Sequence, residues 1–204
     1  LLELDFNTAM AVNLGSADDN LFVDASLTDA LRKAVNNSSP NPLQASLTFM
    51  GGPGAADTLS GPASDSTWNI TGDGTGNIES VNFIQFFGVE NLSGAADNED
   101  TFIFHEGGDL AGVLDGGSGG FDTLVLDGGS YDTVIYSATG PDAGTISRDG
   151  QMITYAGLEP IEDNNNTNKR VIGLSSAADT ARLHEDGDQL SLTDDGSTFE
   201  SITF

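Results

Sequence analysis

The chain has 204 residues and no cysteine, so neither disulfide bonds nor thiolate metal sites can stabilise it. Its fold must instead rest on a buried apolar core, on hydrogen bonds between strands, or on ions bound through oxygen. No run of apolar residues reaches the ~20 that a membrane-spanning helix needs. We therefore expect no membrane insertion.

Basic residues are scarce as well. Six Lys and Arg stand against 32 Asp and Glu, which gives a formal net charge of -26. A nucleic-acid-binding surface needs basic residues to displace counterions, and an anionic membrane attracts proteins through the same residues. Both kinds of partner are excluded on this ground. Self-repulsion of this size also favours screening by salt or by bound divalent cations.

The abundant residues are those of short strands and tight turns. Gly, Asp, Asn and Ser separate β-rich runs throughout the chain, which is typical of strands joined by turns. Strands are predicted over 20–23, 47–50, 82–87, 101–104, 123–126, 133–136 and 152–155. Asp-Gly pairs, which suit turns that need a positive φ, begin at Asp73, Asp115, Asp127, Asp149, Asp186 and Asp195.

One segment departs from this pattern. A short helix is predicted over 28–35, because Leu27, Leu31 and Val35 share one helical face. A loop follows it, so 27–47 is expected to form a helix and loop insertion.

Internal repetition is the strongest signal in the sequence. Three pairs of segments match: 100–109 with 179–188, 86–92 with 155–161, and 51–59 with 116–124. The first pair shares the form Asp-Thr-x-x-x-His-Glu-x-Gly-Asp in identical register, and the third shares Gly-Gly-x-Gly-x-x-Asp-Thr-Leu. Repeats of this kind indicate units that bury their apolar faces by stacking on one another.

The spacing of the Asp-Thr pairs predicts the fold. Those that open strands begin at Asp57, Asp100 and Asp122, at intervals of 43 and 22 residues, whereas the interval from Asp122 to Asp179 breaks the period. About 22 residues suit one turn of a parallel β-helix with three short strands. We expect an all-β chain, a parallel β-helix or β-solenoid with irregular turns and one short helical insertion. A β-sandwich is the alternative. The chain is expected to be a single elongated domain over 1–204, cut from a larger protein, with an Asn-rich loop at 162–170.

The glycine-rich stretches resemble the nonapeptide repeats of the RTX family, in which a Gly-rich half turns and binds calcium while the other half forms a short strand. The matching residues are Gly51, Gly52, Gly54 and Asp57, and Gly116, Gly117, Gly119 and Asp122. Each copy has one more residue before its Asp than the family's form. The resemblance implies calcium binding at these turns.

A larger part of the chain resembles the long degenerate repeats of giant bacterial surface proteins of the adhesin-like or hemagglutinin-like kind. The blocks that carry this resemblance are 68–72, 90–94, 115–119 and 157–161. It implies an extracellular or bacterial cell-surface location. It also implies that neighbouring repeats of the parent chain are the immediate partners.

Calcium is also favoured by the residues themselves, since Ca²⁺ takes oxygen ligands from carboxylates and carbonyls. The candidate ligands are Asp18, Asp19, Asp57, Asp97, Asp100, Asp115 and Asp122. The same residue types also form Asx turns that hold no ion. Both interpretations stay open at this point.

Other chemistries have less support. His105-Glu106 and His184-Glu185 are not followed by a second His, so the zincin motif is absent; their recurrence in a repeat favours a role in turns. Our first hypothesis is a non-catalytic, calcium-stabilised repeat or spacer segment of a secreted or cell-surface bacterial protein involved in adhesion. A module that binds a glycan or another cell-surface ligand is the second. A carboxylate-dependent enzyme acting on polysaccharides is the third.

Overall fold

Alternation of apolar and polar residues gives each short run one face to bury, which is the pattern of a strand. The computed structural model describes residues 10–24, 47–79 and 83–204, and these contain nineteen strands and no helix. All seven predicted strands are present. Within the described residues there is consequently no helix that could cross a membrane. The insertion expected at 27–47 lies outside them, apart from Leu47, where a strand begins.

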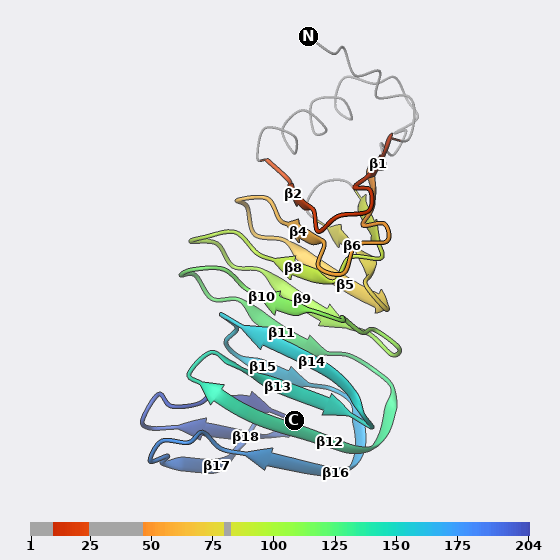
Figure 1. Cartoon of the computed structure of the whole chain (residues 1–204). Coiled ribbons are helices and arrows are strands. Elements are labelled where there is room, and N and C mark those ends of the chain that lie inside the picture. Colours follow the sequence, from red (N-terminus) through yellow and green to blue (C-terminus); the bar gives the residue numbers. More distant parts are fainter. Residues whose placement is uncertain (1–9, 25–46, 80–82) are drawn as a thin grey trace, which may run out of the picture.

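The strands form two sheets that face each other (Figure 1). The first has eleven strands in the order β1 (Met10–Asn13), β3 (Leu47–Met50), β7 (Phe83–Phe87), β6 (Thr75–Glu79), β5 (Thr67–Gly72), β9 (Thr101–Phe104), β11 (Thr123–Leu126), β15 (Ile161–Asp163), β19 (Ile202–Thr203), β18 (Gln189–Asp194) and β17 (Ala181–Asp186). The second has eight, in the order β16 (Asn166–Gly173), β12 (Ser130–Gly140), β13 (Ala143–Arg148), β14 (Gln151–Ala156), β10 (Val113–Asp115), β8 (Asn91–Ser93), β4 (Thr58–Ser60) and β2 (Asn20–Phe22).

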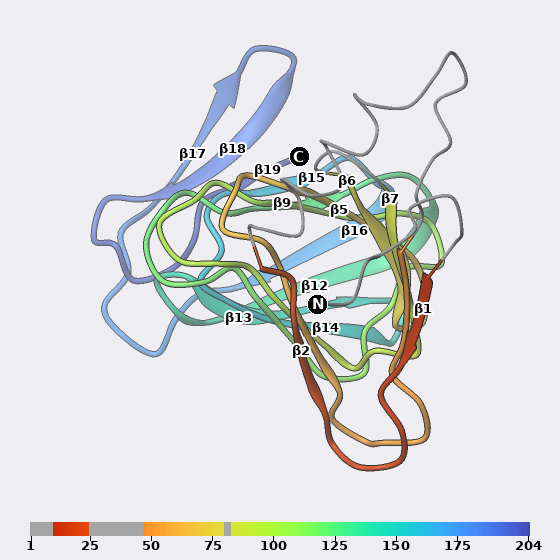
Figure 2. The same cartoon turned by 90° about the horizontal axis from the view of Figure 1, so that it is seen from above.

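The chain winds between the two sheets, and successive coils stack in parallel (Figures 1 and 2). β11 pairs in parallel with β9, so that Thr123 lies opposite Thr101, one coil of 22 residues away. β10 comes between them in the chain and pairs in parallel with β8 in the other sheet. The prediction of a parallel β-solenoid is confirmed. The expected three strands per turn are wrong, because a plain coil contributes one strand to each of two sheets.

Three antiparallel meanders interrupt the plain coils: β5–β6–β7, β12–β13–β14 and β17–β18–β19. In each, the chain moves ahead along the solenoid and then runs back. The last strand therefore pairs in parallel with an earlier coil, β7 with β3, β14 with β10 and β19 with β15. One hairpin of each meander turns at an Asp-Gly pair, beginning at Asp73, Asp149 or Asp186.

The first meander explains why the interval between Asp57 and Asp100 is not a multiple of the coil length. Asp57 precedes β4 in the second sheet, whereas Asp100 and Asp122 precede β9 and β11 in the first sheet. The 43-residue interval from Asp57 to Asp100 therefore spans β4, the whole meander and β8, and does not represent two equal turns. The 22-residue interval is the true period of a plain coil.

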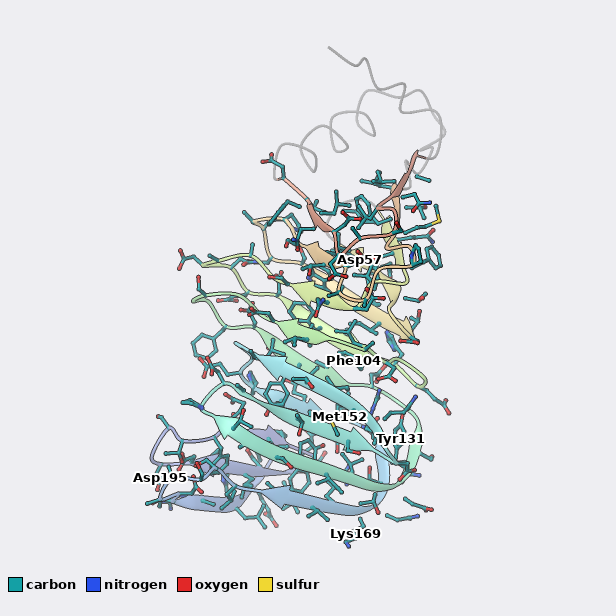
Figure 3. The ribbon with its side chains drawn as sticks, viewed as in Figure 1. Asp57, Phe104, Tyr131, Met152, Lys169 and Asp195 are labelled. Carbon is teal, nitrogen blue, oxygen red and sulfur yellow. The ribbon has the colours of Figure 1, made fainter. Side chains whose placement is uncertain are left out.

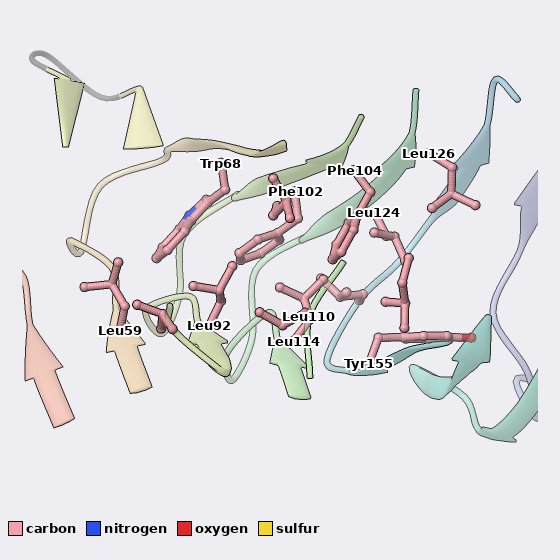
Figure 4. Packing of buried hydrophobic residues seen from close by; sticks show 14 of the residues in the cluster. Leu59, Trp68, Leu92, Phe102, Phe104, Leu110, Leu114, Leu124, Leu126 and Tyr155 are labelled. Carbon is pink, nitrogen blue, oxygen red and sulfur yellow. The ribbon is translucent and has the colours of Figure 1, made fainter. Parts of the chain in front are cut away.

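Inward-facing side chains form a continuous core between the sheets (Figure 4). One row crosses the first sheet through directly paired residues. Its members are Leu47, Ile84, Ile78, Trp68, Phe102, Leu124, Ile161, Ile202 and Leu192. All of them are buried. The stacking of Trp68 on Phe102, with ring centroids 5.2 Å apart, links the first meander to the next plain coil.

The segment 162–170 is mainly strand, contrary to the predicted Asn-rich loop. β15 ends at Asp163 and β16 begins at Asn166, so only two residues separate them. Asp163 is buried, and it accepts hydrogen bonds from the Tyr136 hydroxyl at 2.6 Å and from Arg170 Nε at 2.7 Å. These partners allow a polar residue to occupy an inward position, which the sequence pattern alone does not reveal.

Candidate functional site

The candidate ligands lie at corners where the chain passes from one sheet to the other. In each, a glycine directly follows one strand, and six residues later an Asp directly precedes the next strand. The three such corners run from Gly51 to Asp57, from Gly94 to Asp100 and from Gly116 to Asp122. The sequence analysis found the glycine motif at the first and third corners; at the second, which lacks the second glycine, it selected only the aspartates Asp97 and Asp100.

Close stacking of the coils requires glycine at these corners. A Cβ added at Gly94 would lie 2.1 Å from the main-chain oxygen of Gly116, and one at Gly116 would lie 2.0 Å from that of Gly157. At Gly51 the corresponding distance, to the oxygen of Gly88, is 1.9 Å. The glycines therefore let one coil's main chain lie directly on the next.

The acidic side chains join neighbouring coils by hydrogen bonds to the main chain. Asp100 Oδ1 accepts the N–H of Ser66 at 2.8 Å, and Asp122 Oδ1 accepts the N–H of Asp100 at 2.7 Å. At the other side of the solenoid, Asp57 Oδ1 accepts the N–H of Asp19 at 2.8 Å. The side chains of Asp57, Asp100 and Asp122 are all buried. These carboxyl groups thus add to the few main-chain hydrogen bonds that join the coils at the corners, such as the one from the N–H of Asp97 to the oxygen of Ser118 at 3.1 Å.

Glu90 extends the same arrangement. Its Oε2 accepts the N–H of Asp57 at 2.9 Å, so Asp19, Asp57 and Glu90 mark successive coils. Glu90 lies in the 86–92 repeat, and a search restricted to Asp-Thr pairs does not find it. Glu90, directly before β8, accepts a main-chain N–H from the preceding coil just as Asp57, directly before β4, does.

Burial affects the ionisation of these groups. The pKa of Asp100 is raised to about 6, mainly because the side chain is buried, although hydrogen bonds from Asn98 and Ser66 oppose the rise. The pKa of Asp122 is also raised by burial, and nearby Asp115 adds to the effect. Both groups therefore hold protons more tightly than exposed aspartates do.

Three carboxylate oxygens are buried without a hydrogen-bond partner: Oδ2 of Asp57 at the first corner, Oδ2 of Asp19 in the turn between β1 and β2, and Oδ2 of Asp100 at the second corner. Asp18 lies beside the first two, and its Oδ1 accepts the N–H of Ala55 at 3.1 Å. The three N-terminal candidates are therefore close neighbours, toward the end of the solenoid that carries β1 and β2, where Figure 3 labels Asp57.

The remaining candidates are exposed and have local roles. Asp97 adopts a left-handed conformation with φ of 59° in the turn before Asp100. Asp115 Oδ1 accepts the N–H of Gly117 at 3.0 Å, which fixes the start of the third corner. Within the described ranges no three acidic or His side chains converge in a way that could hold a metal ion. The seven aspartates are thus distributed over the three corners and the turn between β1 and β2, which holds Asp18 and Asp19.

A small acidic pocket opens beside the third corner, with a volume of about 80 Å³. Its carboxyl groups come from Asp122, Asp142 and Glu159, and glycines form the rest of its lining. Glu200 is close to Glu159, and burial raises its pKa to about 7. The sequence analysis found Asp122 alone, because the other three acids belong to different repeats or to none.

The two His-Glu pairs differ in their surroundings. His105 follows β9, and its ring contacts Asn69 Oδ1 at 2.9 Å and Asp127 at 3.2 Å. His184 lies inside β17 and is exposed. The expected turn role is therefore wrong for His184.

A buried arginine was also missed. Arg148 is fully buried on β13, with its guanidinium 5.8 Å from the ring centre of Phe104 and 5.3 Å from that of Tyr131. Burial lowers its pKa, and it donates a hydrogen bond to the main-chain oxygen of Gly108. In sequence it lies just before an Asp-Gly turn, which suggests a surface position rather than a place in the core.

Comparison with known proteins adds no relative. No family model, no curated protein and no solved structure matches the chain. The fold itself defines the class: a two-sheet parallel β-solenoid whose coils are joined by glycine and acidic corners. Any more particular assignment has to come from the chemistry of the chain.

Proposed function

We propose that the chain is a non-catalytic structural spacer in a large secreted or cell-surface bacterial protein involved in adhesion, and that calcium stabilises it. The observation that carries the spacer role is the buried row that runs without a gap from Leu47 to Leu192. With a continuous core and continuous ladders, each coil is stabilised by its neighbours, which suits a segment that separates other parts of a longer protein. The corner carboxyl groups serve this stacking too, since they bind main-chain amides of adjacent coils.

Calcium has separate support. The net charge of -26 destabilises a compact chain unless cations screen it. The unpartnered oxygens of Asp57 and Asp19 are the kind of ligand that Ca²⁺ takes, and main-chain carbonyls of the glycine turns and water would complete the shell. We propose the first corner with Asp57, together with the neighbouring β1–β2 turn that holds Asp18 and Asp19, as the place to look for an ion.

Thermal melting with calcium, with magnesium and with excess chelator tests the calcium part. A ligand that binds the folded chain at 100 times its Kd adds about 2.7 kcal/mol of stability, so calcium should raise the melting temperature. Asp57→Asn should reduce that rise, whereas Asp186→Asn, at the exposed tip of a hairpin, should not. Identical melting temperatures in calcium and chelator would contradict calcium binding and leave the spacer role standing.

The spacer role has a test of its own. Screening the intact chain against a glycan array and against acidic polysaccharides should give neither a binder nor a cleavage product. A saturable glycan ligand would favour the binding module instead, and turnover of a polysaccharide would favour the enzyme.

A further inference from the structure

The first and third meanders have the same topology. In β5–β6–β7 and in β17–β18–β19, the strands run antiparallel, and the last strand pairs in parallel with the preceding coil, β3 or β15. Both belong to the first sheet. They differ at the outer edge of their first strand.

The outer edge of β5 is covered by the next coil. β9 pairs with it in parallel, with Thr67 opposite Thr101 and Trp68 opposite Phe102. β17 ends its sheet, and no strand of the described residues pairs with its outer edge. The hairpin of β17 and β18 extends beyond the outline of the coils when the solenoid is seen from above (Figure 2).

Exposure rises steadily toward this edge. Along one row of paired residues, Ile161 is 0% exposed, Ile202 4%, Leu192 9% and Leu183 60%. Leu190 and Leu174, on the neighbouring strand and just after β16, are 41% and 39% exposed. The end of the solenoid therefore leaves an apolar strip uncovered, whereas Trp68 on β5 is fully buried.

The sequence of β17 matches that of an interior strand. Segment 179–188 repeats 100–109 in register, which aligns Ala181 and Leu183 with Phe102 and Phe104 of β9. β9 is paired on both edges, with β5 and β11. Edge strands that avoid partners often place charges on the inward face; in β17 that face carries Glu185 next to the hairpin turn, but Ala181 and Leu183 along the rest of the strand.

We propose that the outer edge of β17 is the docking site for one further solenoid coil, added as a parallel strand. The incoming strand would carry Thr opposite Thr180 and apolar residues opposite Ala181 and Leu183. An acid before that Thr would accept the N–H of Asp179, as Asp100 Oδ1 accepts that of Ser66. Strand addition of this kind derives its affinity from main-chain hydrogen bonds and its register from the inward side chains.

This inference rests on the proposed spacer role, since a spacer has a neighbouring coil on this side. It also makes a claim that the spacer role does not require: the edge binds a strand of defined sequence and register in trans. The probe is a synthetic peptide of residues 94–106, because β9 occupies the corresponding position on β5.

Disulfide trapping measures both binding and register, because the chain has no cysteine of its own. The peptide with Thr101→Cys is mixed with the chain carrying Thr180→Cys, or with a matched chain carrying Arg182→Cys. Directly paired residues lie within disulfide reach, whereas a shift of two residues does not. We expect Thr180→Cys to be trapped at least about tenfold faster than Arg182→Cys. A peptide with Phe102→Asp and Phe104→Asp should be trapped at neither position.

Equal trapping rates at the two positions, or no adduct with either, would overturn the docking site. If the chain keeps its elongated shape and its melting temperature in that case, the spacer proposal stands. Light scattering of the unmodified chain tests whether a second copy of the chain binds to the edge of β17 instead. A mass that grows with concentration would show that a second copy takes the edge, and would overturn the choice of an added coil.

Discussion

The meanders at β5–β6–β7 and β17–β18–β19 have the same pairing pattern, yet one is buried and the other is largely exposed. Both follow a coil and both turn at an Asp-Gly pair, beginning at Asp73 or Asp186. β5 is covered by β9, whereas β17 has nothing beyond it in the described part of the chain. Local sequence thus determines the meander, but burial depends on the next coil.

The meander in the second sheet completes the comparison. β5–β6–β7 puts two extra strands into the first sheet, and β12–β13–β14 puts two into the second. By β15 and β16 the two sheets therefore have the same number of strands. The third meander has no counterpart in the described residues, which is why the first sheet has eleven strands and the second eight.

The largest expected effect comes from Trp68→Ala in the covered meander. Trp68 is fully buried and stacks on Phe102, so the substitution leaves a large cavity. Chemical denaturation should show a loss of about 3–5 kcal/mol in the free energy of unfolding. A loss below about 1 kcal/mol would mean that the core is not packed at this point.

Glycine-to-alanine substitutions compare a corner that is covered by the next coil with a hairpin turn of the open meander. A Cβ at Gly94 would meet the main-chain oxygen of Gly116 at 2.1 Å, and because main chain cannot yield easily, Gly94→Ala should cost about 3 kcal/mol. Gly187, in the hairpin of the open meander, has φ of 64° and open space around it. Gly187→Ala should therefore cost only the conformational penalty of about 1 kcal/mol. Equal losses in denaturation would contradict stacking at the corner.

The pH dependence of the free energy of unfolding tests one buried carboxyl group near each of these two meanders. The pKa of Asp100 rises from its ordinary 3.8 to about 6, and that of Glu200 from 4.5 to about 7. The unfolded chain loses these protons first as pH increases, so stability should fall between about pH 4 and pH 7 and level off above it. Relief of charge repulsion on acidification acts in the same direction.

Isosteric variants separate the two causes. Asp100→Asn should flatten the lower part of this pH dependence, and Glu200→Gln should flatten the upper part, in denaturation curves recorded at each pH. Asp186→Asn, at an exposed turn, removes the same charge as a control. If the control flattens the curve as much as the other two, general repulsion explains the pH dependence.

The smallest expected effect is that of Leu183→Ala in the open meander. Leu183 belongs to the same row as Trp68 but is 60% exposed, so the free energy of unfolding should change by less than about 0.5 kcal/mol. A loss similar to that of a core leucine would show that the edge is already covered in solution.

Much of the fold could be predicted from the sequence. The strands at Leu47–Met50, Thr101–Phe104 and Thr123–Leu126 have the predicted bounds, because each alternates strictly between inward and outward residues. The 22-residue period was visible where no meander intervenes. The meanders were not predicted, because spacing along the chain does not say which sheet a strand joins.

The candidate site was predicted only in part. Asp57, Asp100 and Asp122 were selected as candidate calcium ligands, and the structure shows that each is buried and bonded to a neighbouring coil. Glu159 and Glu200 lie together near Asp122 only after the chain has folded, and no local motif joins them. Binding of calcium at any of these residues stays a prediction.

The central claim is that the covering coil stabilises the β5–β6–β7 meander and that the β17–β18–β19 meander is open because it lacks one. Amide hydrogen exchange on the intact chain, measured at 67–79 and 181–194, tests this claim most directly. Amides of β5 and β6 should exchange only through global unfolding, whereas those of β17 should exchange far faster through local opening. Addition of the 94–106 peptide should slow exchange in β17 and leave β5 unchanged. Equal protection of the two meanders in the free chain would contradict this account.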